Sequence, residues 1–112
     1  MLFGNLFSRP KIAEISALEA HARHQDGAVI LDVREVSEWR AGHIPGAVHI
    51  PLGRLAEQVG ELDPASELIV VCRSGNRSAA ATSALQQAGF ANVRNLSGGM
   101  IAWTRQRLPV TR

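Results

Sequence analysis

The segment Leu68-Ile69-Val70-Val71-Cys72-Arg73-Ser74-Gly75-Asn76-Arg77-Ser78 decides how this chain folds. Its first four residues are apolar, which predicts a short strand buried on both faces of a sheet. A polar loop with one glycine follows Cys72, and an alanine-rich stretch at residues 79–88 then predicts a helix. Gly89 stands where a left-handed residue commonly ends a helix. A buried strand that leads through a loop into a helix is typical of an α/β sheet.

Strand and helix patterns alternate along the whole chain. Besides residues 68–71, strands are expected at residues 28–33, 47–50 and 93–96. Helices are expected from Ser16 to Gly27, at 35–40, at 52–62, at 79–88 and after Gly99. Such alternation predicts a compact α/β fold, in which a largely parallel sheet has helices on both faces.

The composition is that of one soluble globular domain. The chain has 112 residues, of which 46% are hydrophobic and 20% charged. Cys72 is the single cysteine, so a disulfide within the chain is excluded, and an unpaired thiol suits the reducing cytoplasm. We expect one domain at residues 11–112, after a short and loosely packed apolar segment at residues 1–10. That segment is too short for a membrane span, and its pattern does not fit a signal peptide.

The distribution of charge argues against a nucleic-acid partner. The formal net charge is +2, and eleven of the twelve basic residues are arginines, spread from Arg9 to Arg112. A nucleic-acid-binding surface usually concentrates its basic residues and interleaves them with stacking rings, whereas this chain has only three Phe and two Trp. We therefore expect no nucleic-acid partner and, by default, a monomer.

Cys72 is the candidate reactive residue. It follows a buried strand, at the sheet edge where open α/β folds bind ligands. The next helix offers unpaired N–H groups, the loop amides can converge on an anion, and Arg73 and Arg77 add permanent positive charge. Short polar side chains in the same loop come from Ser74, Asn76 and Ser78. Each feature favours a thiolate, so the pattern predicts a reactive cysteine of low pKa rather than an inert core thiol.

Four motifs in this chain resemble those of the rhodanese-type sulfurtransferases and occur in that family's order. The first is residues 31–34 with Glu38 and Trp39, and the second is residues 42–47 with Ile50 and Pro51. The cysteine loop, residues 72–78, is the third, and residues 96–99 with Ala102 and Trp103 are the fourth. The motifs cover about residues 12–110, so the resemblance extends over essentially the whole domain.

The resemblance implies a sulfurtransferase in which Cys72 accepts a sulfane sulfur, becomes a persulfide and passes the sulfur on. The donor would be thiosulfate or a related persulfide, and the acceptor would be cyanide, a thiol or a protein cysteine. Arg73 and Arg77 would attract the anionic donor, while the loop amides around Gly75 would hold the transferred sulfur. This covalent, ping-pong chemistry needs no cofactor, no metal and no dedicated base.

Asp32 and Arg34 are expected to support the site. Asp32 ends a predicted strand and either orients the cysteine loop through hydrogen bonds or pairs with Arg34; neither role transfers a proton. The other expectations near the motifs are structural: a solvated helical face for Glu38, loop hydrogen bonds for His43 and His49, and a core position for Trp103.

Three other functions stay open on the sequence alone. A partner-binding module would use the same loop for docking, and a redox-sensing thiol would need glutathione or another protein as its resolving thiol. Cysteine-dependent phosphatases and arsenate reductases also place a cysteine loop between a strand and a helix. Only four residues separate Cys72 from Arg77, fewer than those enzymes use, which favours a single sulfur atom over a bound tetrahedral oxyanion.

Overall fold

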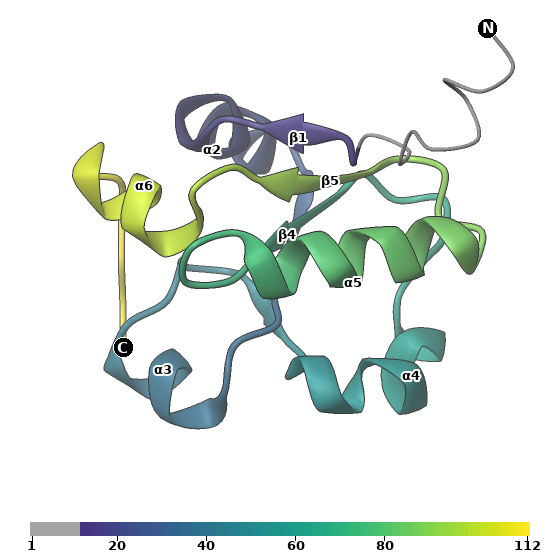
Figure 1. Ribbon diagram of the computed structural model, residues 1–112. Coiled ribbons are helices and arrows are strands. Elements are labelled where there is room, and N and C mark those ends of the chain that lie inside the picture. The colour runs from purple at the N-terminus through teal and green to yellow at the C-terminus, as the bar shows by residue number, and fades with distance from the viewer. Residues whose placement is uncertain (1–11) are drawn as a thin grey trace, which may run out of the picture.

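The computed structural model describes residues 12–112 and has the predicted α/β architecture (Figure 1). Its five strands are all parallel and lie in the order β1-β5-β4-β2-β3. Their bounds are Glu14–Ile15 (β1), Val29–Asp32 (β2), Val48–His49 (β3), Leu68–Val71 (β4) and Val93–Leu96 (β5). This order places β4, which leads into the cysteine loop, at the centre of the sheet. The predicted N-terminal segment, residues 1–10, lies outside the described residues.

The helices connect the strands and are unequal in length. Their bounds are Ala17–Gln25 (α2), Val36–Ala41 (α3), Leu55–Gln58 (α4), Asn76–Gln87 (α5) and Gly99–Arg105 (α6). Two 3-10 turns flank α4, Leu52–Arg54 (η1) before it and Val59–Glu61 (η2) after it. Gly89 has a left-handed φ of 99° and follows the end of α5, as predicted. Within residues 12–112, no helix combines the length and the apolarity needed to cross a membrane.

Apolar side chains pack against both faces of the sheet, as the sequence predicts. Helices α4 and α5 cover one face, and α2 and α6 cover the other (Figure 1). Leu55 and Leu85 belong to the core on the first face, and Ala20 and Trp103 to the core on the second. Trp103 is fully buried, and its indole N–H donates to the carbonyl of Pro109 at 2.8 Å. Because helices cover both faces, the C-terminal edge of the sheet is left as the place for a site.

Three features of the fold differ from the expectation. Helix α5 begins three residues earlier than expected, so the second half of the predicted polar loop forms its first turn. Strand β1 was not expected, because two residues carry no readable periodicity; the amides of Asn95 and Ser97 in and after β5 hold it by donating to Ala13 and Ile15. The helix expected at residues 52–62 is divided into η1, α4 and η2. Two glycines, which are poor helix formers, stand in that stretch at positions 53 and 60.

Candidate active site

Cys72 lies at the C-terminal edge of the sheet, between the end of β4 at Val71 and the start of α5 at Asn76. The residue is almost fully buried, with 1% of its surface exposed. Strand β4 lies in the sheet between β2, which ends at Asp32, and β5, which contains Asn95. The end of the central strand therefore positions the thiol at the C-terminal edge of the sheet, as predicted from the sequence.

Hydrogen-bond donors of the loop surround the Cys72 sulfur. The amide of Gly75 lies 3.1 Å from Sγ, and the hydroxyl oxygen of Ser78 lies 3.2 Å from it. Burial by itself raises the pKa of this thiol, but the hydroxyl of Ser78 and the amides of Ser78, Gly75 and Ser74 together outweigh it and lower the pKa. The loop therefore favours the nucleophilic thiolate.

Backbone contacts with α6 fix the other side of the cysteine loop. The amides of Met100 and Ile101 donate to the carbonyls of Cys72 and Arg73, at 2.9 and 3.1 Å. Gly99 permits this approach, since a Cβ at its position would overlap the same two carbonyl groups. The double glycine of the fourth motif thus belongs to the site, because it brings the start of α6 against the loop.

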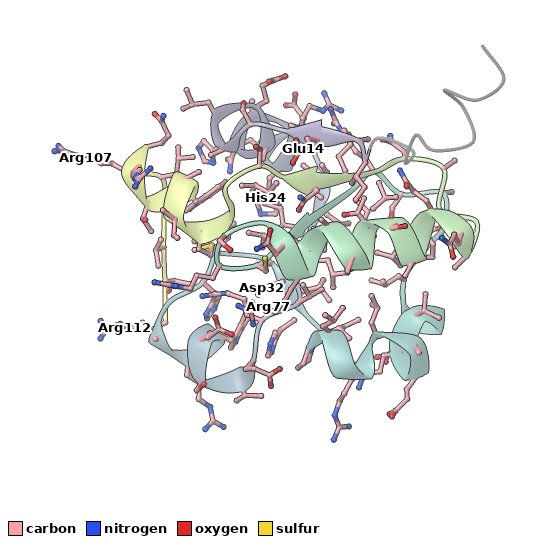
Figure 2. All side chains as sticks on the ribbon, viewed as in Figure 1. Glu14, His24, Asp32, Arg77, Arg107 and Arg112 are labelled. Carbon is pink, nitrogen blue, oxygen red and sulfur yellow. The ribbon has the colours of Figure 1, made fainter. Side chains whose placement is uncertain are left out.

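The two arginines of the loop differ in their contacts. Arg77 donates two hydrogen bonds to the carboxylate of Glu38 in α3, at 2.6 and 2.8 Å. The side chains of Arg77 and Asp32 both lie toward the end of the sheet from which α5 starts (Figure 2). Arg73 is exposed, and among residues 12–112 its side chain has neither a hydrogen-bond nor an ion-pair partner.

The ion pair with Arg77 corrects the expectation for Glu38. Hydrogen bonds from Arg77 lower the pKa of Glu38 to about 2, and the same bonds raise the pKa of Arg77. Glu38 is therefore not simply part of a solvated helical face. It links α3 to the cysteine loop and neutralises one of the loop's two positive charges.

Asp32 pairs with Arg34, which is the simpler of its two predicted roles. Its carboxylate accepts three hydrogen bonds from the Arg34 guanidinium, at 2.8–3.0 Å, and one from the Arg34 amide at 2.9 Å. Arg34 also donates to the carbonyl of Gly42 at 2.8 Å. In the described part of the chain, the Asp32 carboxylate makes no hydrogen bond to the cysteine loop. The pair supports the segment between β2 and the Gly42 turn.

Asn95 is a site residue that the sequence reasoning missed. It is 2% exposed in β5, and its amide group links two residues of the loop, accepting from the Ser78 hydroxyl at 2.5 Å and donating to the carbonyl of Gly75 at 3.1 Å. A short amide side chain inside a predicted strand, three residues before the double glycine at 98–99, was the available signal. The remaining predicted loop residues, Ser74 and Asn76, are exposed.

An aromatic stack begins at Trp39, the residue that follows Glu38 in α3. The ring of Trp39 in α3 stacks on His43 and on His49, with centroid separations of 3.6 and 4.6 Å. One ring nitrogen of His43 bonds to the carbonyl of Trp39 at 2.8 Å, and one of His49 to the carbonyl of Arg34 at 2.7 Å. Both histidines thus make the loop hydrogen bonds expected of them.

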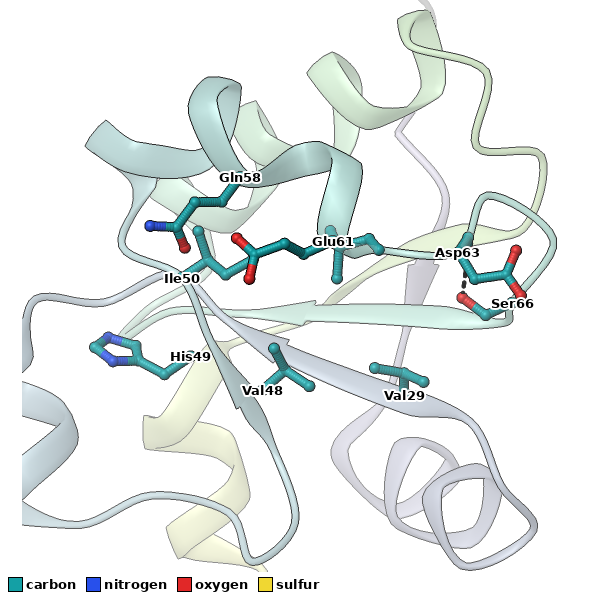
Figure 3. Close-up of a pocket in the computed structure, with 9 residues that line it drawn as sticks. Val29, Val48, His49, Ile50, Gln58, Glu61, Asp63 and Ser66 are labelled. Carbon is teal, nitrogen blue, oxygen red and sulfur yellow. Dashed lines mark hydrogen bonds between the residues drawn. The ribbon is translucent and has the colours of Figure 1, made fainter.

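Two hollows differ in their relation to Cys72. One, of about 290 Å³, adjoins the cysteine loop and has three charged lining residues, Arg34, Glu38 and Arg73. The other, of about 430 Å³, lies between β3 and η2 and is lined by His49, Gln58 and Glu61 among others (Figure 3). The larger hollow contains no residue of the cysteine loop, so the smaller one is the candidate site for a ligand that reacts with Cys72.

The fold and the site together define a class of protein. A cysteine at the carboxyl end of a central parallel strand, with amide and hydroxyl donors around its sulfur, characterises α/β proteins that use a nucleophilic thiol. The family model of the rhodanese-like domain matches residues 16–106, and the chain belongs to this family. The family that the four motifs predicted is confirmed.

Individual relatives agree with this assignment. Thiosulfate sulfurtransferase GlpE of Pseudomonas entomophila (strain L48) is 37% identical over 89 residues, covering 80% of this chain and 82% of the relative. YrkF of Bacillus subtilis (strain 168) is 39% identical over 100 residues, so that the match spans 89% of this chain and 54% of YrkF. The crystal structure of a rhodanese-related protein from Thermoplasma volcanium has a TM-score of 0.82 and 33% identity, covering 88% of this chain and 97% of that one. These similarities support sulfur transfer as the chain's general activity.

Proposed function

We propose that this chain transfers a sulfane sulfur from thiosulfate, or from a related persulfide donor, through a persulfide on Cys72 to a thiophilic acceptor. The observation that carries the proposal is the pair of donors at Cys72 Sγ, the Gly75 amide at 3.1 Å and the Ser78 hydroxyl at 3.2 Å. Both stabilise negative charge on sulfur, which the attacking thiolate requires.

In the first half-reaction, the Cys72 thiolate attacks the outer sulfur of thiosulfate. A bond forms between Sγ and that sulfur, the original sulfur–sulfur bond breaks, and its electron pair leaves with sulfite. No proton moves in this step, so no general base is needed. Amides of the loop and of the first turn of α5 stabilise the negative outer sulfur of the persulfide.

In the second half-reaction, the acceptor attacks the outer sulfur of the persulfide. The bond to Sγ breaks, its electron pair returns to Sγ, and the Cys72 thiolate is restored. Cyanide leaves as thiocyanate, whereas a thiolate acceptor leaves as a new persulfide. The acceptor in the cell is a thiol or a protein cysteine in this proposal, and cyanide serves in the assay.

Arg73 is the residue that meets the anionic end of the donor in this proposal. It lines the hollow next to the loop together with Arg34 and Glu38. Arg34 and Glu38 are each held in an ion pair, by Asp32 and by Arg77. Arg73 therefore supplies the hollow's unpaired positive charge among residues 12–112, and a sulfonate group is a suitable partner for it.

The intact mass of the protein after incubation with thiosulfate tests the proposal. We expect the wild-type chain to gain one sulfur atom and to lose it on addition of cyanide, because the persulfide is both formed and discharged at Cys72. The Cys72→Ser variant, which retains the loop's donors but lacks the thiol, is the control and should gain none. A wild-type chain that gains no sulfur from thiosulfate or from a persulfide donor contradicts the proposal.

A further inference from the structure

The hydroxyl of Ser78 lies between two groups that compete for its single proton. Its oxygen is 3.2 Å from Cys72 Sγ and 2.5 Å from the side-chain oxygen of Asn95. Ser78 is fully buried and Asn95 is 2% exposed. A hydroxyl has one proton to donate, so it can satisfy either the sulfur or the amide oxygen at one time.

The orientation of the Asn95 amide is fixed by its other contacts. Its nitrogen donates to the carbonyl of Gly75 at 3.1 Å and lies 3.5 Å from a carboxylate oxygen of Glu14. Both contacts need N–H groups, so the amide oxygen, which can only accept, faces Ser78. The Ser78 proton must then lie between the two oxygens, since otherwise lone pairs would oppose each other at 2.5 Å.

The position of the Ser78 proton by itself fits the uncharged thiol better than the thiolate, whereas the loop as a whole lowers the pKa of Cys72. While Ser78 donates to Asn95, its oxygen presents lone pairs to Cys72 Sγ and can accept a hydrogen bond from the thiol S–H. When the thiol ionises, the charged sulfur needs a donor, and Ser78 can provide one only by turning its proton away from Asn95. The free energy of that lost bond opposes formation of the thiolate.

We propose that Asn95 is a positioning residue that withholds the Ser78 proton from Cys72 until the sulfur becomes negative. In the thiol the proton lies on the Asn95 side, and in the thiolate it turns toward Sγ. After a sulfur is accepted, the negative charge resides on the outer sulfur and the proton returns to Asn95. This last step rests on the proposed persulfide chemistry, whereas the first two do not.

Among the charged groups nearby, Glu14 contacts Asn95 directly, through the amide nitrogen at 3.5 Å and not through the oxygen that faces Ser78. Arg77 is paired with Glu38, and Arg73 is exposed. Because Asn95→Ala removes the Glu14 contact whether or not Ser78 is present, the comparison of the two backgrounds separates that loss from the competition for the Ser78 proton. The competition is therefore confined to three groups, Cys72, Ser78 and Asn95, and a double-mutant cycle can isolate it.

The test is the pKa of Cys72, measured from the pH dependence of its alkylation by iodoacetamide. The chain has one cysteine, so the alkylation rate reports this thiol alone. We expect Ser78→Ala to raise the pKa by about one unit, because the thiolate loses a donor. Asn95→Ala should lower it by about half a unit or more, because Ser78 becomes free to donate to sulfur. In a Ser78→Ala background, Asn95→Ala should cause no shift.

Thr82→Val provides a matched control in α5. The Thr82 hydroxyl is fully buried, one turn after Ser78, and donates to the Ser78 carbonyl at 2.7 Å without contacting the sulfur. Its loss should leave the Cys72 pKa unchanged. If Asn95→Ala does not fold, Asn95→Leu repeats the test with a side chain that is branched at the same atom and has no acceptor.

Two results would overturn the inference. A rise in pKa in Asn95→Ala, or the same shift with and without Ser78, would mean that Asn95 only supports the loop through Gly75. The measurement uses no sulfur donor, so its failure is independent of whether the chain forms a persulfide from thiosulfate.

Discussion

Two arginine–carboxylate pairs flank the candidate site and differ in burial and in origin. Arg34 and Asp32 are two residues apart in the sequence, and their side chains are 7% and 0% exposed. Arg77 and Glu38 are 39 residues apart, and their side chains are 35% and 27% exposed. Both pairs have short, well-aligned hydrogen bonds, so their difference lies in their access to water.

The buried pair, Arg34 and Asp32, matters mainly for the stability of the fold. The more exposed pair, Arg77 and Glu38, matters mainly for the charge near the cysteine loop. A lone charge left behind in the buried pair would have no solvent around it, so each partner of that pair is indispensable to the other. Each partner of the half-exposed pair can be solvated when the other is removed. The main effect of the half-exposed pair is to attach α3 to the cysteine loop, and within residues 12–112 it leaves Arg73 as the unpaired arginine of that loop.

The largest expected effect is a loss of stability in Asp32→Asn, which breaks the buried pair. The substitution removes the negative charge but leaves Arg34 charged and buried, which should lower the free energy of unfolding by about 3 kcal/mol. Urea unfolding at neutral pH measures this loss. Asp26→Asn, at a position whose side chain is 72% exposed, is the control and should change stability little. A loss below about 1 kcal/mol at Asp32 would mean that the two pairs are energetically alike.

A smaller effect, on the binding of thiosulfate, is expected in Arg73→Ala, which removes the unpaired charge. The donor loses a charge-assisted hydrogen bond, so the KM for thiosulfate should rise about tenfold while kcat changes little. Steady-state kinetics with cyanide as the acceptor measures both constants. Arg54→Ala, which removes an exposed arginine from η1, is the control. An unchanged KM in Arg73→Ala would mean that Arg73 does not bind the donor, and would point to the paired arginine, Arg77, in its place.

The same contrast explains what the sequence could predict. The β4 strand, the loop and α5 form one continuous segment, and periodicity with short-range capping signals describes such a segment well. The Asp32–Arg34 pair was also accessible, as one of two interpretations, because its partners are two residues apart. The loop's own donors, such as Gly75 and Ser78, lie within six residues of Cys72.

The contacts that Glu38 and Asn95 make with the cysteine loop could not be predicted, because folding brings the partners together from distant positions in the sequence. Glu38 is 39 residues from Arg77, and Asn95 is 17 residues from Ser78. A single sequence contains many carboxylates and amides that could fill either position, and periodicity does not choose between them. Strand β1 was missed for a related reason, since its pairing with β5 rather than its own pattern defines it.

The smallest expected effect concerns the half-exposed pair, in Glu38→Gln. The folded protein holds the pKa of Glu38 at about 2, below its ordinary value of 4.5, so the carboxylate stabilises the fold above pH 4.5. That contribution is lost as the pH falls from 4.5 toward 2. Since both side chains are partly exposed, we expect only about 1 kcal/mol.

Urea unfolding of wild type and Glu38→Gln at a series of pH values measures this contribution. Glutamine still accepts the hydrogen bond from the Glu35 amide that begins α3, so the helix cap is retained. The two proteins should differ by about 1 kcal/mol at pH 7, and the difference should shrink as the pH falls through about 2, where the wild-type carboxylate takes up its proton. Glu57→Gln, at an exposed position in α4, controls for the change in net charge. A difference that persists unchanged at low pH would show that Glu38 acts through packing, and would remove the electrostatic distinction between the two pairs.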